Sequence, residues 1–132
     1  MINSANPKSP IPDIVINAIP ASGSANNQGH IPVADAVPSL KTAGSGFAIL
    51  TGTIYAYDKT GNAVGYKNLN YLIPSGGVTP VDDSMGEDLA VQFSVSLVLD
   101  GRKNATFDVS NTGTSGAIDV VITDLQVRYF GT

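Results

Sequence analysis

Residues 91–99 alternate between apolar side chains at odd positions and mainly polar side chains at even positions, and this pattern constrains the fold most. A period of two is typical of an antiparallel strand with one buried face and one face open to water or to a partner. The same period recurs in residues 47–57, 63–73, 105–109 and 117–130. No stretch keeps an apolar stripe at helical spacing without Gly or Pro, so the sequence predicts almost no helix.

The number and spacing of these segments favour two packed sheets. About seven or eight strands, separated by turn-rich connections, are typical of an antiparallel sandwich or barrel. We therefore predict an all-β, antiparallel β-sandwich. A single jelly roll is the first interpretation, because the connections are uneven in length and the last strand is long. An immunoglobulin-like sandwich is the second.

The last segment changes phase in its middle. Apolar residues at 118, 120 and 122 share one face, whereas those at 125, 127 and 129 fall on the opposite one. One extra residue in a strand restores a common face. We therefore expect a β-bulge near Thr123 and Asp124.

The first 45 residues differ from the remainder in composition. Six of the eight prolines lie within the first 38 residues, and proline excludes both a continuous helix and a central strand. We predict that residues 1–45 form an extended N-terminal arm with one short strand over 14–19 and a flexible polar loop over 21–29. Residues 46–132 are predicted to form the β-sandwich domain.

Four isoleucines of the arm are candidates for contacts with another molecule. Ile11, Ile14, Ile16 and Ile19 are apolar anchors in an otherwise polar, proline-rich segment. A free tail gains nothing from such residues, whereas an arm that docks on a neighbouring subunit buries them. These four residues are therefore predicted to mediate interaction.

Composition and charge exclude several classes of protein. Only 14% of the residues are charged, against about 25% in ordinary soluble domains, so the polar surface must come from Ser, Thr, Asn and Gly. The net charge of −4 lacks the basic footprint of a nucleic-acid-binding protein. The chain contains no cysteine, which excludes a disulfide scaffold and a thiolate metal site. No apolar run is long enough for a membrane span.

The sequence nominates no catalytic residue. It holds one histidine and no cysteine, so no nucleophile can be paired with a general base. We predict that the chain is not an enzyme and has no catalytic site and no resident organic cofactor.

One acidic group could bind a cation. Asp82, Asp83, Glu87 and Asp88 lie within one expected loop, and calcium binds six to eight oxygen ligands of this kind. The spacing is not that of an EF-hand loop. Calcium is the only cofactor that this group suggests, and the alternative is a solvated acidic loop that discourages edge pairing.

Three tyrosines form the second candidate surface. Tyr55 and Tyr57 share a strand face, and Tyr66 could lie across the expected hairpin. Such rings can stack on a glycan or on a protein partner, and cross-strand aromatic packing explains them as well.

Taken together, these features resemble the single-jelly-roll coat, penton or accessory proteins of small bacteriophages. They are a small all-β domain, a long N-terminal arm, no cysteine, neutral polar faces and no nominated active site. The resemblance is architectural, covers residues 46–132 and rests on no diagnostic motif.

The resemblance implies a virion structural protein whose partners are copies of itself and other virion proteins. The N-terminus lacks a secretory signal, so we expect a protein made in the host cytoplasm and located in the virion. The acidity argues against direct contact with nucleic acid and favours a coat, vertex or decoration role. The alternative is a carbohydrate-binding or adhesin-type β-sandwich on a spike or fibre.

Overall fold

The fold is described from a computed structural model, which covers residues 3–5, 11–32, 46–74, 81–88, 91–99, 104–113 and 116–131. Within these ranges every regular element is a β-strand. In chain order the strands are β1 (Asn3–Ala5), β2 (Ile14–Ile19), β3 (Ser24–Pro32), β4 (Gly46–Asp58), β5 (Ala63–Pro74), β6 (Val81–Asp82), β7 (Met85–Asp88), β8 (Phe93–Leu99), β9 (Asn104–Asn111) and β10 (Ile118–Gly131). The prediction of an all-β protein is confirmed.

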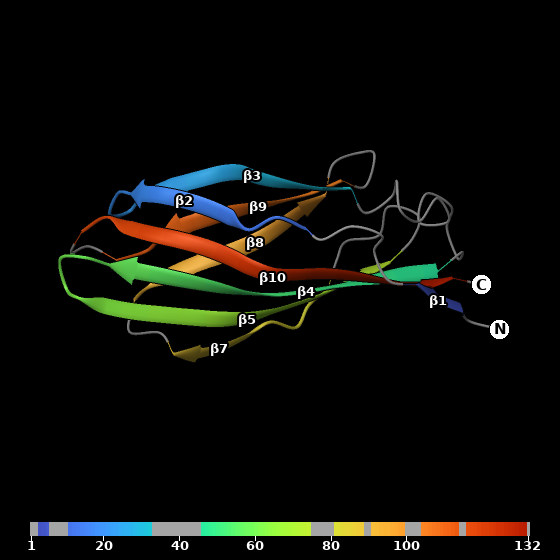
Figure 1. The fold of residues 1–132 in the computed structure, drawn as a ribbon. Helices are drawn as coiled ribbons and strands as arrows, with labels where there is room; N and C mark the ends of the chain where they lie inside the picture. Colours follow the sequence, from blue (N-terminus) through green and yellow to red (C-terminus); the bar gives the residue numbers. More distant parts are fainter. Residues whose placement is uncertain are drawn as a thin grey trace.

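The strands form two antiparallel sheets, which Figure 1 shows as two layers. The larger sheet has the order β1-β10-β4-β5-β6, with β2 also paired to β10 and β7 also paired to β5. The smaller sheet has the order β3-β9-β8. In the larger sheet β10 returns to lie beside β4, which gives β10-β4-β5-β6 the strand order of a Greek key. The β-sandwich is thus confirmed, and the jelly roll stays a prediction.

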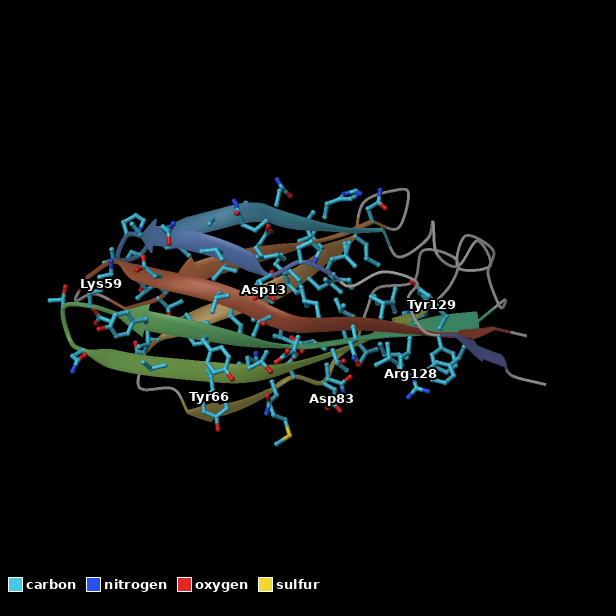
Figure 2. All side chains as sticks on the ribbon, viewed as in Figure 1. Asp13, Lys59, Tyr66, Asp83, Arg128 and Tyr129 are labelled. Atoms are coloured by element: carbon cyan, nitrogen blue, oxygen red, sulfur yellow. The ribbon has the colours of Figure 1, made fainter. Side chains whose placement is uncertain are left out.

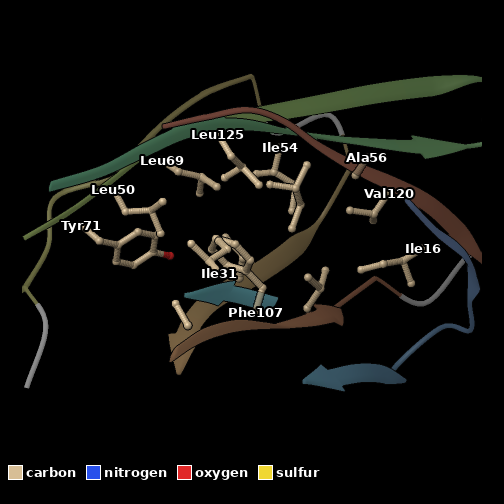
Figure 3. Close-up of a cluster of buried hydrophobic side chains, with 14 of the residues drawn as sticks. Ile16, Ile31, Leu50, Ile54, Ala56, Leu69, Tyr71, Phe107, Val120 and Leu125 are labelled. Carbon is tan, nitrogen blue, oxygen red and sulfur yellow. The ribbon is translucent and has the colours of Figure 1, made fainter. Parts of the chain in front are cut away.

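A single hydrophobic core fills the space between the two sheets (Figure 3). Leu50, Ile54 and Tyr71 enter it from the larger sheet, while Ile31 and Phe107 enter from the smaller one. The rings of Tyr71 and Phe107 lie 6.3 Å apart between centroids. Burial of these apolar side chains, each excluded from water on all sides, supplies most of the driving force for joining the two layers.

The hairpin of β4 and β5 is the most regular part of the molecule. Its residues pair without interruption from Phe47 opposite Pro74 to Asp58 opposite Ala63. The turn is closed by the Asp58 carboxylate, which accepts hydrogen bonds from the backbone N–H groups of Thr60 and Gly61 at 3.0 and 3.2 Å. An aspartate that caps its own turn in this way fixes the hairpin register.

The predicted bulge in β10 is present. Thr123 is paired to Thr53 of β4 and Gln126 to Thr51, so two residues of β10 stand opposite Gly52 alone. Asp124 has a φ of 54°. The bulge turns the apolar residues on both sides of it toward the core, and the inner face of β10 therefore stays buried along the strand.

Residues 14–32 form two strands, where the sequence predicted one short strand and a flexible loop. β2 pairs with β10 of the larger sheet, and β3 pairs with β9 of the smaller sheet. The predicted flexible loop over 21–29 is therefore wrong from Ser24 onward, because Ser24–Pro32 is a strand. The described part of the predicted arm contributes strands to both sheets across the 45/46 boundary.

The four isoleucines contact the protein's own core. Ile16 and Ile19 are buried, and Ile11 and Ile14 pack partly buried against the core cluster. Ile16 and Ile19 are covered by the same chain, so their predicted interaction role is corrected to a core role. Ile11 and Ile14 keep part of their surface exposed, and their interaction role stays a prediction. Within β2 the buried Ile16 and Ile19 are three residues apart, which departs from regular alternation.

A bulge in β2 explains that spacing, and a similar bulge interrupts β3. Ala18 has a φ of 56°, and its N–H donates to the Asp119 carboxylate of β10 at 2.9 Å. Asn27 of β3 also has a φ of 56°, and its N–H donates to the Asp108 carboxylate of β9 at 2.9 Å. In both strands an aspartate on the neighbouring strand thus stabilises a residue in the left-handed region, and the strand continues with its phase shifted.

Candidate interaction surface

The outer face of the larger sheet carries a continuous row of apolar and aromatic side chains. Strand alternation turns residues Val15, Val121, Tyr55 and Tyr66 away from the core, and these four residues are called the aromatic row below. Val15 of β2 is paired to Val121 of β10, Val121 to Tyr55 of β4, and Tyr55 to Tyr66 of β5. The row therefore crosses four strands in register.

The aromatic row is partly open to solvent, because Val15 and Tyr55 are exposed whereas Val121 and Tyr66 are half-buried. Val15 is 64% exposed and Tyr55 41% exposed. The Tyr55 and Tyr66 rings lie 6.0 Å apart between centroids at an interplanar angle of 36°. Exposed large apolar side chains are ordinary when scattered, but a contiguous group marks a surface for interaction.

A second row extends this surface toward the β4–β5 turn. Tyr57 and Val64 face each other across the hairpin, and both are exposed. The Tyr57 hydroxyl donates to the Asn62 side-chain oxygen at 3.2 Å, which holds the ring over the turn. The surface therefore contains the three predicted tyrosines on one face.

A charged pair borders the second row. Asp119 is paired to Tyr57, and the Lys59 ammonium lies 3.3 Å from the Asp119 carboxylate. The N–H of Ala18, and to a lesser degree Lys59, hold the pKa of Asp119 below its ordinary value. Asp119 therefore stays ionised. Its contacts with Ala18 of β2 and with Lys59 of the β4–β5 turn hold these two segments at the edge of the surface.

The middle of the same face is polar. It consists of uncharged side chains from the three central strands, namely Thr51, Thr53, Asn68, Asn70, Thr123 and Gln126. The Thr53 hydroxyl donates to the Asn68 side chain at 3.5 Å. This band separates the aromatic row from the other end of the sheet.

The far end of the face is aromatic again. The Phe47 and Phe130 rings stack with centroids 4.9 Å apart, and the Arg128 guanidinium lies 5.5 Å from the centre of the Phe130 ring. This is the geometry of a cation–π contact. Figure 2 shows Lys59 and Tyr66 toward one end of the larger sheet and Arg128 toward the other.

The outer face of the smaller sheet has a different chemistry. Outward positions there are occupied mainly by small hydroxyl and amide side chains, with Asp108 the carboxylate among them. Ser24 and Ser110 share a hydrogen bond of 2.7 Å between their hydroxyls. Val98 is the exposed large apolar side chain on this face.

The acidic group lies at the edge of the larger sheet, where a loop was predicted. β6 and β7 pair with β5, so much of the segment is extended. The Asp82 carboxylate accepts the Ser84 N–H at 2.9 Å. The N–H of Asp83, which Figure 2 labels at this edge, donates to the Asn70 carbonyl at 2.8 Å. The side chains of Glu87 and Asp88 lie outside the described residues.

Within the described part of the chain, no three acidic or histidine side chains come together as a metal site would need. Asp82 instead stabilises its own turn, as Asp58 does, whereas Asp108 and Asp119 stabilise bulges in the neighbouring strands. Calcium binding remains a prediction from the sequence.

A buried tyrosine lies beneath this edge. Tyr71 faces the core, and its hydroxyl has no hydrogen-bond partner of normal geometry among the described residues, although Ser84 and Asp82 are close. Burial, and then the Asp82 charge, raise the pKa of Tyr71 to about 12. This hydroxyl is therefore neutral at ordinary pH, and the ring packs in the core.

Sequence reasoning located the tyrosines but missed their neighbours. Tyr55, Tyr57 and Tyr66 lie on one face as predicted, whereas Val15 and Val121 join them from strands distant in sequence. Val121 could have been noticed as an apolar residue at an outward position of β10. Val15 could not, because its place depends on the pairing of β2 with β10.

Comparisons with known proteins assign no relative. No protein-family model, curated protein or solved structure matches this chain. The described residues contain no helix that could span a membrane.

Proposed function

We propose that this chain is a non-enzymatic structural subunit that assembles through the outer face of its larger sheet. The observation that carries the proposal is the aromatic row, which presents Val15, Val121, Tyr55 and Tyr66 in register across four strands. Tyrosine is enriched at the centres of protein interfaces because one ring supplies large apolar area and a polar tip.

The assembly proposed for the subunit is a virion, in a coat, vertex or decoration position. Support comes from the small sandwich, the neutral polar surface and the architectural resemblance to small bacteriophage virion proteins. Symmetric assemblies bring the same surface patch of many copies into repeated contact. The partners are therefore copies of this chain and other virion proteins.

The test is the native mass of the purified protein and of Tyr55→Ser/Tyr66→Ser, by light scattering after size exclusion. A closed oligomer or larger particle is expected for the wild type. Loss of two central tyrosines should weaken the contact by about 2 kcal/mol or more per residue, as for interface hot spots, and should shift the variant toward a smaller assembly than that of the wild type. Thr106→Ala, on the outer face of the smaller sheet, is the matched control. A wild type that stays monomeric at every concentration would contradict self-assembly.

A carbohydrate-binding module is the second candidate. The observation in its favour is the pair of tyrosine rings, 6.0 Å apart, on an exposed sheet face beside the amide side chain of Asn68. Sugars stack on such rings and hydrogen-bond to neighbouring amides. A glycan screen of the isolated protein separates the candidates: binding lost in Tyr55→Ala/Tyr66→Ala would favour the module, and its absence would favour the structural subunit.

A further inference from the structure

The two sheets together have four edges, and three of them are interrupted. β2 carries a bulge at Ala18 and β3 carries register shifts around Asn27 and Gly29. On the opposite side of the larger sheet, β5 is covered by the short strands β6 and β7. Bulges and very short strands are the usual means by which proteins prevent edge-to-edge pairing.

The fourth edge, β8, has none of these features. Phe93–Leu99 pairs with β9 over seven consecutive residues without a register shift. Its sequence, FSVSLVL, contains no charge, no Pro and no Gly. No described segment pairs with its other side. A regular, uncharged edge strand can offer its outer backbone N–H and C=O groups to another strand.

Three of the four inward side chains of β8 are only partly covered, while Val95 among them is buried. Phe93, Leu97 and Leu99 pack against the core but stay half-buried, whereas Phe107 and Val109 of the adjacent strand are fully buried. A strand added beside β8 would continue the smaller sheet and bury this apolar edge.

We infer that β8 pairs antiparallel with β8 of a second copy of this chain, about a two-fold axis at Ser96. This register sets Phe93 opposite Leu99 and Val95 opposite Leu97 on the inner side. On the outer side it sets Ser94 opposite Val98 and Ser96 opposite itself. Every inward pair is apolar, so β8 is complementary to itself, as an isologous interface requires.

Charge is compatible with the same arrangement. The chain has a net charge of −4, but Phe93–Leu99 brings no charged side chain to the axis. The β8 edge is separate from the aromatic row, and either contact can exist without the other.

Cysteine cross-linking tests the axis directly, because the chain has no cysteine of its own. Opposite residues of an antiparallel pair have Cα atoms about 4.5–5.5 Å apart, within the roughly 4.4–6.8 Å that a disulfide spans. Under mild oxidation Ser96→Cys should form a disulfide-linked dimer. Thr106→Cys lies one strand inside the edge on the same face and should not.

At about 10 μM protein the expected difference in rate is about 100-fold, because the effective concentration within a dimer is on the order of 1 mM. Equal cross-linking rates for the two variants would overturn the inference. A second pair of variants tests the contact without requiring favourable disulfide geometry. Ser96→Lys and Ser96→Glu should each be monomeric at this contact, because like charges meet at the axis, and an equimolar mixture should recover the paired species. No recovery in the mixture would also count against the β8 pair.

Discussion

The outer faces of the two sheets cover the same core but have opposite chemistry. The larger sheet presents Val15, Val121, Tyr55 and Tyr66 in one row. The smaller sheet presents hydroxyl and amide side chains, as in the bond between Ser24 and Ser110. Because the inner faces are equally apolar, the outward positions decide what each sheet can contact. The larger sheet is suited to a partner and the face of the smaller sheet to water.

The largest expected effect comes from the core that both faces share. Phe107→Ala removes a fully buried ring that contacts Tyr71 of the opposite sheet. We expect a loss of about 3–5 kcal/mol in the free energy of unfolding, measured by urea titration. Thr106→Ala, the neighbouring outward residue, should change it by less than about 0.5 kcal/mol. Similar losses for both variants would mean that the inward and outward positions of β9 are misassigned.

The second prediction compares the inner and outer sides of β2. Ile19 is 2% exposed, whereas Val15 is 64% exposed. Ile19→Ala should destabilise by about 2–5 kcal/mol, and Val15→Ala by less than about 0.5 kcal/mol, in the same titration. If Ile19→Ala had no effect on the purified protein, β2 would belong to an arm and not to the sandwich.

The third prediction concerns the bulge that keeps β10 in phase. A Cβ atom on Gly52 would lie 2.8 Å from the Leu125 side chain and 3.1 Å from the Thr123 carbonyl oxygen. Gly52→Ala should therefore cost about 1–3 kcal/mol through overpacking. Thr53→Ala is the control on the open face. A stabilised Gly52→Ala protein would show that β4 and β10 do not approach so closely.

The fourth prediction concerns how the free energy of unfolding depends on pH through the buried Tyr71. The pKa of Tyr71 is raised in the folded protein from 10.0 to about 12, so the folded state holds this proton more tightly than the unfolded state. The corresponding stability is fully present below pH 10 and is lost as the pH rises toward 12. Tyr71→Phe should have near wild-type stability at neutral pH, because the hydroxyl makes no hydrogen bond, and should lose less stability in alkali.

Urea midpoints measured across the alkaline range test this prediction. Burial also raises the pKa of Tyr129, so Tyr71→Phe should retain part of the alkaline loss. A variant whose midpoint falls with pH as steeply as that of the wild type would show that Tyr71 is not the titrating group.

The regular strands could be predicted from the sequence, because alternation reports burial directly. The β4–β5 hairpin, β8 and the bulge in β10 follow from the phase of their apolar residues. β3 could not be predicted, since SANNQGHIP shows no alternation and carries residues in the left-handed region at Asn27 and Gly29. Its pairing depends on β9 and on the Asp108 carboxylate, which come much later in the chain.

The candidate surface was half predictable for a similar reason. Tyr55 and Tyr66 are joined by a short turn, so their pairing follows from the hairpin alone. Val15 and Val121 are distant in sequence, and only the tertiary register sets them beside the tyrosines. The assignment of Ile16 and Ile19 to a docking role was wrong, because both are buried in the core. In a proline-rich segment, the sequence does not distinguish apolar residues that pack in the protein's own core from those that contact a partner.

Thiol labelling of two single-cysteine variants tests most directly whether the two outer faces differ in use. Val121→Cys lies in the centre of the aromatic row, and Thr106→Cys lies on the central strand of the smaller sheet. With increasing protein concentration, labelling of Val121→Cys should slow as the row becomes covered, while labelling of Thr106→Cys should stay constant. Equal and concentration-independent rates at both positions would contradict assembly through the larger sheet.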